Sequence, residues 1–158
     1  MWYRPLPAAA EESNAALEEL RKAPGGQALV APALQEVQGQ YLLRSGQRDR
    51  AHAMLDDLVK KIRALPGPDN WVQALFTMES IARTARDAGD WEFAERIAQQ
   101  MVEHDANYAG GHFALGLAAA HRRDLARARE QFAIAMRQWS TADPDLMELL
   151  RTQSAELR

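Results

Sequence analysis

The sequence predicts an all-α protein built as an array of antiparallel helix pairs. Apolar residues recur three and four positions apart through most of the chain, which is the spacing of one helical face. No stretch of useful length alternates apolar and polar residues, as a half-buried strand would. Alanine, the strongest helix former, supplies 30 of the 158 residues. We therefore expect helices and no sheet.

Length and charge narrow the class of protein further. A chain of 158 residues is long enough for one domain with a hydrophobic core. Its net charge of -3 provides no general cationic field, so we expect neither nucleic acid nor a membrane as a partner. The sequence contains no cysteine, which excludes disulfides and thiolate metal sites and leaves the cellular compartment open. Neither a signal-peptide pattern nor an apolar run near the ~20 residues of a membrane span is visible.

The N-terminal part predicts a capping segment and one helix pair. Residues 1–28 combine a tail with a short helix that ends at a Pro-Gly-Gly sequence, and we expect this helix to cap the array. The first helix of the pair runs from about Val30 to Gly46 on apolar spacing. Its partner covers residues 51–62, and the Pro-Gly-Pro sequence at 66–68 closes the pair.

Two more pairs and a terminal helix follow. Their helices are expected at residues 71–88, 91–102, 108–121 and 125–138. Gly89 ends the first of these helices, and Asp90 is a good N-cap for the next. Asp124 occupies the corresponding place in the following pair. A last helix opens with an Asp-Pro sequence, so we expect residues 29–142 to hold the pairs and residues 143–158 to cap them.

The second and third pairs share one pattern. Ala94 and Ala128 are separated by an offset of 34 (128 − 94 = 34), and several small residues meet small ones at this offset. The other aligned positions are Ile81 with Leu115, Ala82 with Gly116, Ala85 with Ala119, Asp90 with Asp124, Ala98 with Phe132, and Met101 with Ala135. Helices that cross closely need Ala or Gly where their backbones approach. The sequence therefore predicts an internal repeat.

This pattern resembles the tetratricopeptide repeat family, whose unit is a helix-turn-helix of about 34 residues. Five signature positions are matched in order by Leu115, Gly116, Ala128, Phe132 and Ala135. The sequence departs from the family pattern at His112, Ala119 and Ser140. An earlier copy is expected around Gly39, Gly46, Ala51, Leu55 and Leu58, with an insertion of nine residues because Ala51 and Ala94 are 43 apart (94 − 51 = 43; 43 − 34 = 9).

The resemblance is clearest over residues 75–142. It implies about three repeats stacked as a right-handed superhelical array, an α-solenoid, which binds a partner through a groove lined by the first helix of each pair. The family's groove positions correspond here to Arg44, Phe76, Glu79, Arg83, Arg86, Phe113, Leu117 and His121, and also to Glu36, Gln40, Leu43 and Asp87. The arginines and phenylalanines suit an acidic or carboxylate-bearing peptide. The family's carboxylate-clamp subtype is not expected, because its Lys and Asn positions hold other residues.

No sequence motif points to an enzyme. Phosphate-binding loops, dinucleotide-binding loops, the zinc protease motif and the nucleophile elbow do not occur. His112 and His121 are nine residues apart and would point to opposite sides of one helix, so they cannot share a metal there. We interpret His112 as a semi-buried packing residue. No catalytic residue, metal or cofactor is expected.

The arginine-rich residues 121–130 have two interpretations. They could contact nucleic acid phosphates, but a solvated helix face whose arginine stems cover apolar surface explains them without a ligand. The function that we predict is therefore a noncatalytic protein-protein interaction module that binds a peptide or a neighbouring domain. Two alternatives stay open, a self-assembling scaffold that forms a homo-oligomer and a helper domain of a larger catalytic polypeptide.

Overall fold

The computed structural model describes residues 26–139 without interruption, together with residues 12, 15, 16, 18, 19, 22, 148, 151–153 and 155. The two predicted capping segments, residues 1–28 and 143–158, therefore lie largely outside the described residues. Their capping role, and with it the predicted division of the chain into a repeat region and two caps, stays a prediction.

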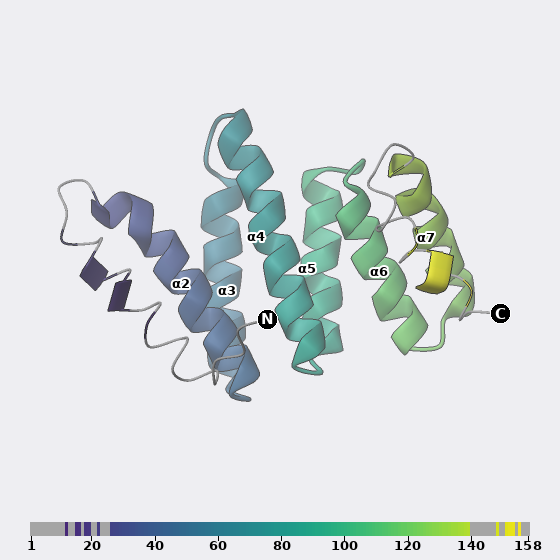
Figure 1. The fold of residues 1–158 in the computed structure, drawn as a ribbon, viewed down its shortest axis with the longest axis horizontal. Coiled ribbons are helices and arrows are strands. Elements are labelled where there is room, and N and C mark those ends of the chain that lie inside the picture. Colours follow the sequence, from purple (N-terminus) through teal and green to yellow (C-terminus); the bar gives the residue numbers. More distant parts are fainter. Residues whose placement is uncertain are drawn as a thin grey trace. The chain divides into compact units, whose positions relative to one another are not determined.

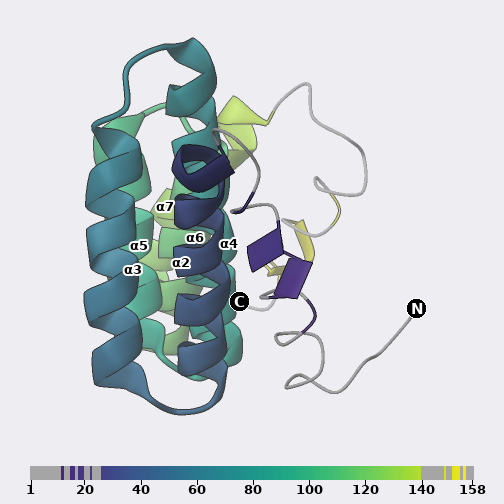
Figure 2. The same cartoon turned by 90° about the vertical axis from the view of Figure 1, so that its left-hand side faces the viewer.

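Between residues 26 and 139 the chain forms six helices and no strand. The helices are α2 (Gly26–Arg44), α3 (Arg48–Arg63), α4 (Pro68–Asp87), α5 (Trp91–His104), α6 (Ala109–His121) and α7 (Leu125–Gln138). Figures 1 and 2 show that α2 packs beside α3, and that α6 packs beside both α5 and α7. An all-α fold in which neighbouring helices pack in pairs is thereby confirmed. No described helix is both long and apolar enough to cross a membrane.

The chain divides into two compact units, Met1–Thr77 and Met78–Arg158, with the boundary inside α4. In the first unit, α2 packs on α3 around Gly39, because a Cβ atom at this position would lie only 2.4 Å from Leu55 Cδ2. The amide of Gln35 ties the same two helices together by donating to the Met54 carbonyl oxygen at 2.7 Å. The buried apolar side chains of this pair are Val30, Leu34, Leu42, Leu43, Ala51, Leu55, Leu58, Val59 and Ile62.

Helix α2 begins at Gly26, earlier than the start near Val30 that the sequence predicted. The helix thus begins at the last residue of the Pro-Gly-Gly sequence, because one glycine in a helix costs only about 1 kcal/mol. Val30 and Leu34 are both buried, and packing of this kind outweighs such a weak local preference. Pro32 also lies inside the helix, and because proline has no backbone N–H, one helical hydrogen bond is missing there.

In the second unit, Gly116 of α6 lies at a close approach between two helices, as Gly39 of α2 does in the first unit. A Cβ atom at Gly116 would lie 2.4 Å from Phe132 Cδ1, so α6 and α7 approach closely at this point. Both contacts join residues sixteen positions apart in the sequence (55 − 39 = 16; 132 − 116 = 16). Ala128, at the predicted crossing of these helices, is fully buried. The close packing at small residues that the repeat pattern predicted is confirmed for this pair.

The turns inside the pairs also repeat. Gly46, Gly89 and Arg123 each have a positive φ angle, of 78°, 72° and 63°. After each of them the next backbone N–H donates to a carbonyl oxygen five residues back, from Gln47 to Leu42, from Asp90 to Ala85 and from Asp124 to Ala119. This is the Schellman arrangement that ends helices. The turns recur at the two offsets that the sequence predicted, 43 and 34 (89 − 46 = 43; 123 − 89 = 34).

Two of these turns lead directly into an N-cap. The Asp90 carboxylate accepts a hydrogen bond from the Phe93 backbone N–H at 3.3 Å, and Asp124 accepts one from Arg127 at 3.1 Å. Both caps were predicted, and both are confirmed. Gln47, in the corresponding place before α3, makes no such side-chain bond.

Arg123 lies in a backbone conformation that glycine adopts more readily, so Arg123→Gly is expected to stabilise the protein. The left-handed conformation costs an L-residue about 1–2 kcal/mol, and the greater freedom of glycine in the unfolded chain offsets part of the gain. We expect the free energy of unfolding to rise by about 0.5–1 kcal/mol in urea denaturation. Gly89→Ala, the opposite change in the equivalent turn, should lower it by about 1 kcal/mol. A less stable Arg123→Gly variant would contradict the turn assignment.

Candidate functional site

The eight predicted groove residues are distributed over both units. Arg44, the last residue of α2, and Phe76 on α4 belong to the first unit, and both are exposed. The other six belong to the second unit. Phe76 is 55% exposed, which is unusual for a large apolar side chain and is consistent with a contact surface. Val72, one helical turn before Phe76 on α4, is 41% exposed.

Leu43 does not lie on the surface where the family resemblance placed it. The family resemblance placed it beside Arg44 on the binding surface, but Leu43 is only 2% exposed and belongs to the core between α2 and α3. Adjacent helix residues point about 100° apart, so an exposed Arg44 leaves its neighbour facing the core. Leu43 therefore stabilises the helix pair and is not available to a ligand.

Glu79 makes a contact that the sequence did not predict. Its carboxylate accepts a hydrogen bond from the hydroxyl of Tyr108, which is the N-cap residue of α6. Burial and the neighbouring Glu79 carboxylate both raise the pKa of the Tyr108 hydroxyl above its ordinary value, so Tyr108 remains a donor at neutral pH. Gly110 leaves room for this pair, because a Cβ atom there would lie 2.7 Å from Tyr108 Cε1 and 3.2 Å from Glu79 Oε2.

Arg83 and Arg86 lie three residues apart on α4 and therefore on neighbouring parts of its surface. Arg83 is exposed and Arg86 is half-buried. Arg86 Nη2 lies 3.4 Å from Asp87 Oδ1, a long contact between sequence neighbours. The two guanidinium groups are the positive charges of this part of α4, and its negative charges are Glu79 and Asp87.

The predicted groove residues of α6 all contact other side chains of the second unit. Phe113 lies between two aromatic rings, with centroid distances of 5.8 Å to Phe132 and 5.6 Å to Trp139. Leu117 packs against the same buried cluster, which contains Ala119, Ala128, Phe132 and Ala135. The His121 ring stacks on Trp91 at 4.1 Å with an angle of 8° between the planes. Phe113 and Leu117 are half-buried, whereas His121 is exposed at the end of the helix.

His112 is buried, and both of its ring nitrogens make polar contacts. It is 7% exposed, and its Nε2 lies 3.0 Å from the Ala106 carbonyl oxygen while Nδ1 lies 2.8 Å from Gln131 Oε1. The backbone carbonyl oxygen of Ala106 can only accept, so Nε2 carries a hydrogen and donates it to Ala106. The direction of the Nδ1 contact with Gln131 depends on the ring tautomer and on which end of the Gln131 amide faces the ring. His112 thereby links the α5–α6 loop to α7. The burial that we predicted is confirmed, but the hydrogen bonds to both ring nitrogens were not foreseen.

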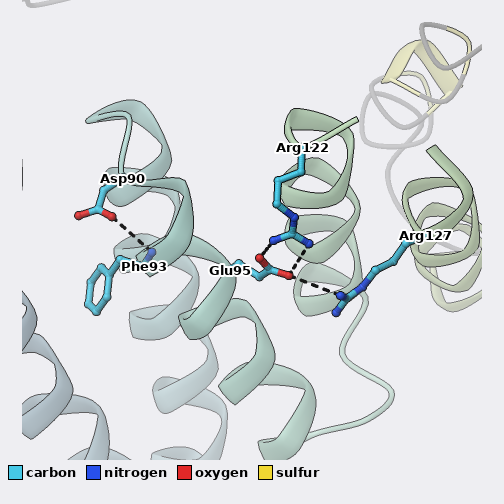
Figure 3. Close-up of polar contacts among 5 residues, drawn as sticks. All are labelled: Asp90, Phe93, Glu95, Arg122 and Arg127. Atoms are coloured by element: carbon cyan, nitrogen blue, oxygen red, sulfur yellow. Dashed lines mark hydrogen bonds and ion pairs between the residues drawn. The ribbon is translucent and has the colours of Figure 1, made fainter. Parts of the chain in front are cut away.

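Two arginines of the basic segment 121–130 are engaged by one carboxylate. Figure 3 shows Arg122 and Arg127 both directed at Glu95 of α5. Arg122 Nη2 donates to Glu95 Oε1 at 2.8 Å, and Arg127 Nη1 lies 3.7 Å from the same oxygen. Glu95 is 19% exposed, so the network is partly shielded from water. These two arginines join α5 to α6 and α7, which gives part of the segment a structural role.

The exposed residues of the predicted groove offer charged and apolar contacts for a ligand. In the part of the chain that the structure describes, no three His, Asp or Glu side chains come together to hold a metal ion. Of the eight predicted groove residues, Arg44 and Phe76 in the first unit and Arg83 and His121 in the second are exposed. The class of protein that the fold defines is an all-α array of packed helix pairs. No family model, curated protein or solved structure matches the chain significantly.

Proposed function

We propose that this protein is a noncatalytic protein-protein interaction module, built as a right-handed superhelical array of tetratricopeptide-like repeats. The observation that carries the proposal is the recurrence of one helix-turn-helix geometry. The positive-φ turns at Gly46, Gly89 and Arg123 follow the repeat intervals, and the close approaches at Gly39 and Gly116 have the same separation from their partners. Arrays of this kind present the first helix of each pair to a partner, because stacking buries the other faces.

The partner that the charges favour is an acidic peptide or an acidic segment of a neighbouring domain. The exposed guanidinium of Arg83 can bind a carboxylate through two parallel hydrogen bonds, and Arg86 follows one helical turn later. Two carboxylates separated by one turn of helix, or by two residues of extended chain, would match this spacing. Arginine also stacks on apolar side chains, so a ligand with an apolar residue between its acidic residues is suited to the same surface.

Replacing both Arg83 and Arg86 with alanine is expected to weaken peptide binding about tenfold, because each loses a charge-assisted hydrogen bond at a partly solvated site. Fluorescence anisotropy with a fluorescein-labelled twelve-residue peptide of alternating Glu-Glu and Leu-Leu pairs measures this. The same peptide with Gln in place of Glu should bind weakly to every variant. Removal of Arg83 and Arg86 should leave the helical circular dichroism signal unchanged.

The matched control is the double variant Arg129→Ala and Arg137→Ala. It changes the net charge by the same amount at two exposed positions of α7. Arg127 is not used, because its ion pair with Glu95 joins α5 to α7. Arg129 also has an interaction with another residue, so the circular dichroism signal of the control variant is measured as well. If the control pair weakened binding and the Arg83 and Arg86 pair did not, the binding surface on α4 would be wrong.

Self-assembly is the second candidate, and one observation favours it. Four large apolar side chains of the first unit are exposed, Leu65 at 47%, Trp71 at 40%, Val72 at 41% and Phe76 at 55%. Exposed apolar side chains of this size mark contact surfaces, and a second copy of the chain is one partner that would cover them. Light scattering over a concentration series separates this function from peptide binding by a monomer.

A further inference from the structure

Glu79 has two possible partners in the second unit. Arg83 follows it by four residues on α4, and a glutamate placed one turn before an arginine is the favourable order for an intrahelical ion pair. In the structure Glu79 pairs with Tyr108 and not with Arg83. Its carboxylate accepts a hydrogen bond from the hydroxyl of Tyr108, at the start of α6. Arg83 makes no hydrogen bond or ion pair with any described residue.

The position of Tyr108 is well suited to hold Glu79. As the N-cap residue of α6 it has an extended backbone, with φ −73° and ψ 105°. Its backbone N–H donates to the Asp105 carbonyl oxygen at 3.0 Å, which anchors it in the loop after α5. The ring lies against Gly110, where any side chain would meet Tyr108 Cε1 and Glu79 Oε2. The pair therefore depends on a fixed loop and on the absence of a side chain at residue 110.

We propose that Tyr108 is a positioning residue, which keeps the Glu79 carboxylate away from Arg83 and so leaves the Arg83 guanidinium available to the carboxylate of an acidic ligand. Without the Tyr108 hydroxyl, Glu79 would pair with Arg83 along α4 and compete with the ligand for the same guanidinium. The first step, the placement of Glu79, concerns the protein alone. The second step, the effect on a ligand, rests on the proposed function.

The affinity test uses Tyr108→Phe, Glu79→Gln and the double variant with the labelled Glu-Leu peptide at low ionic strength. Tyr108→Phe is expected to weaken binding about two- to fourfold, which is the size of an exposed intrahelical ion pair. In the Glu79→Gln background the same change should have no effect, because no carboxylate is left to compete. Tyr41→Phe on α2 removes a half-buried tyrosine hydroxyl elsewhere and is the matched control.

A second measurement tests the placement of Glu79 without any ligand. The Nε–Hε resonance of Arg83 in a proton–nitrogen NMR spectrum, assigned with Arg83→Lys, reports whether its guanidinium is paired. We expect it to shift and to exchange more slowly with water in Tyr108→Phe than in the wild type. It should return to the wild-type position in the double variant, since glutamine cannot form the ion pair.

The outcomes separate the two proposals. An Arg83 resonance that is unchanged in Tyr108→Phe would overturn the positioning role of Tyr108, whatever the peptide does. Weak binding by Tyr108→Phe that persists in the double variant would also overturn it, because the loss would then come from altered folding. If instead Arg83→Ala bound the peptide as tightly as the wild type, the proposed function would fail while the resonance still tested Tyr108.

Discussion

Gly116→Val is expected to lower the free energy of unfolding by about 3 kcal/mol. The reason is the distance of 2.4 Å between a Cβ atom at this position and Phe132 Cδ1, which is far inside the contact distance of two carbon atoms. Phe132 is 1% exposed and lies in the cluster between α6 and α7, so its ring has little room to move. Urea denaturation followed by circular dichroism at 222 nm measures the change.

Two controls separate overpacking from the general cost of valine in a helix. Ala133→Val adds a valine at an exposed position of α7 and should cost only about 0.5 kcal/mol. Shrinking the opposing ring should help, so Phe132→Leu combined with Gly116→Ala should cost less than the sum of the two single changes. Equal unfolding midpoints for wild type and Gly116→Val would show that α6 and α7 do not approach at this point.

His112→Phe is expected to be the second most damaging change, at about 2–3 kcal/mol. Phenylalanine keeps an aromatic ring of similar size, so the loss comes from hydrogen bonds and not from a cavity. The Ala106 carbonyl oxygen and the Gln131 side chain would each lose a partner next to a side chain that is 7% exposed. An unsatisfied polar group in such a place costs about 1–3 kcal/mol. Thermal and urea denaturation both report the effect.

His121→Phe is the matched control for His112. It makes the same chemical change in the same helix, but His121 is exposed and stacks on Trp91, a contact that phenylalanine also makes. We expect a change below about 0.5 kcal/mol. If His112→Phe were as stable as the wild type, the two polar contacts of His112 would contribute nothing to stability.

The helices and their turns could be predicted from the sequence alone, because they depend on residues close together along the chain. Apolar spacing located α3 to α7, and Asp90 and Asp124 form the N-caps that were expected. The repeat offset also followed from the sequence, since a repeated turn and a repeated close approach demand similar residues at regular intervals. Arg123 extends this pattern in the structure, where it takes the conformation that glycine has in the equivalent turns.

The side-chain partners that shape the candidate site were decided by the tertiary structure. Tyr108 bonds to Glu79, His112 to Gln131 and Arg122 to Glu95, and each pair joins residues of different helices or of a helix and a loop. A helical pattern shows which face a residue occupies, but not which residue of a neighbouring helix lies opposite. Leu43 and Phe113 show the consequence, because both were assigned to a binding surface, and packing against α3 or α7 determines how much of each is exposed. Whether Glu79 pairs with Arg83 or with Tyr108 was beyond the sequence for the same reason: the competing partner is distant along the chain and becomes a neighbour only when α6 packs in place.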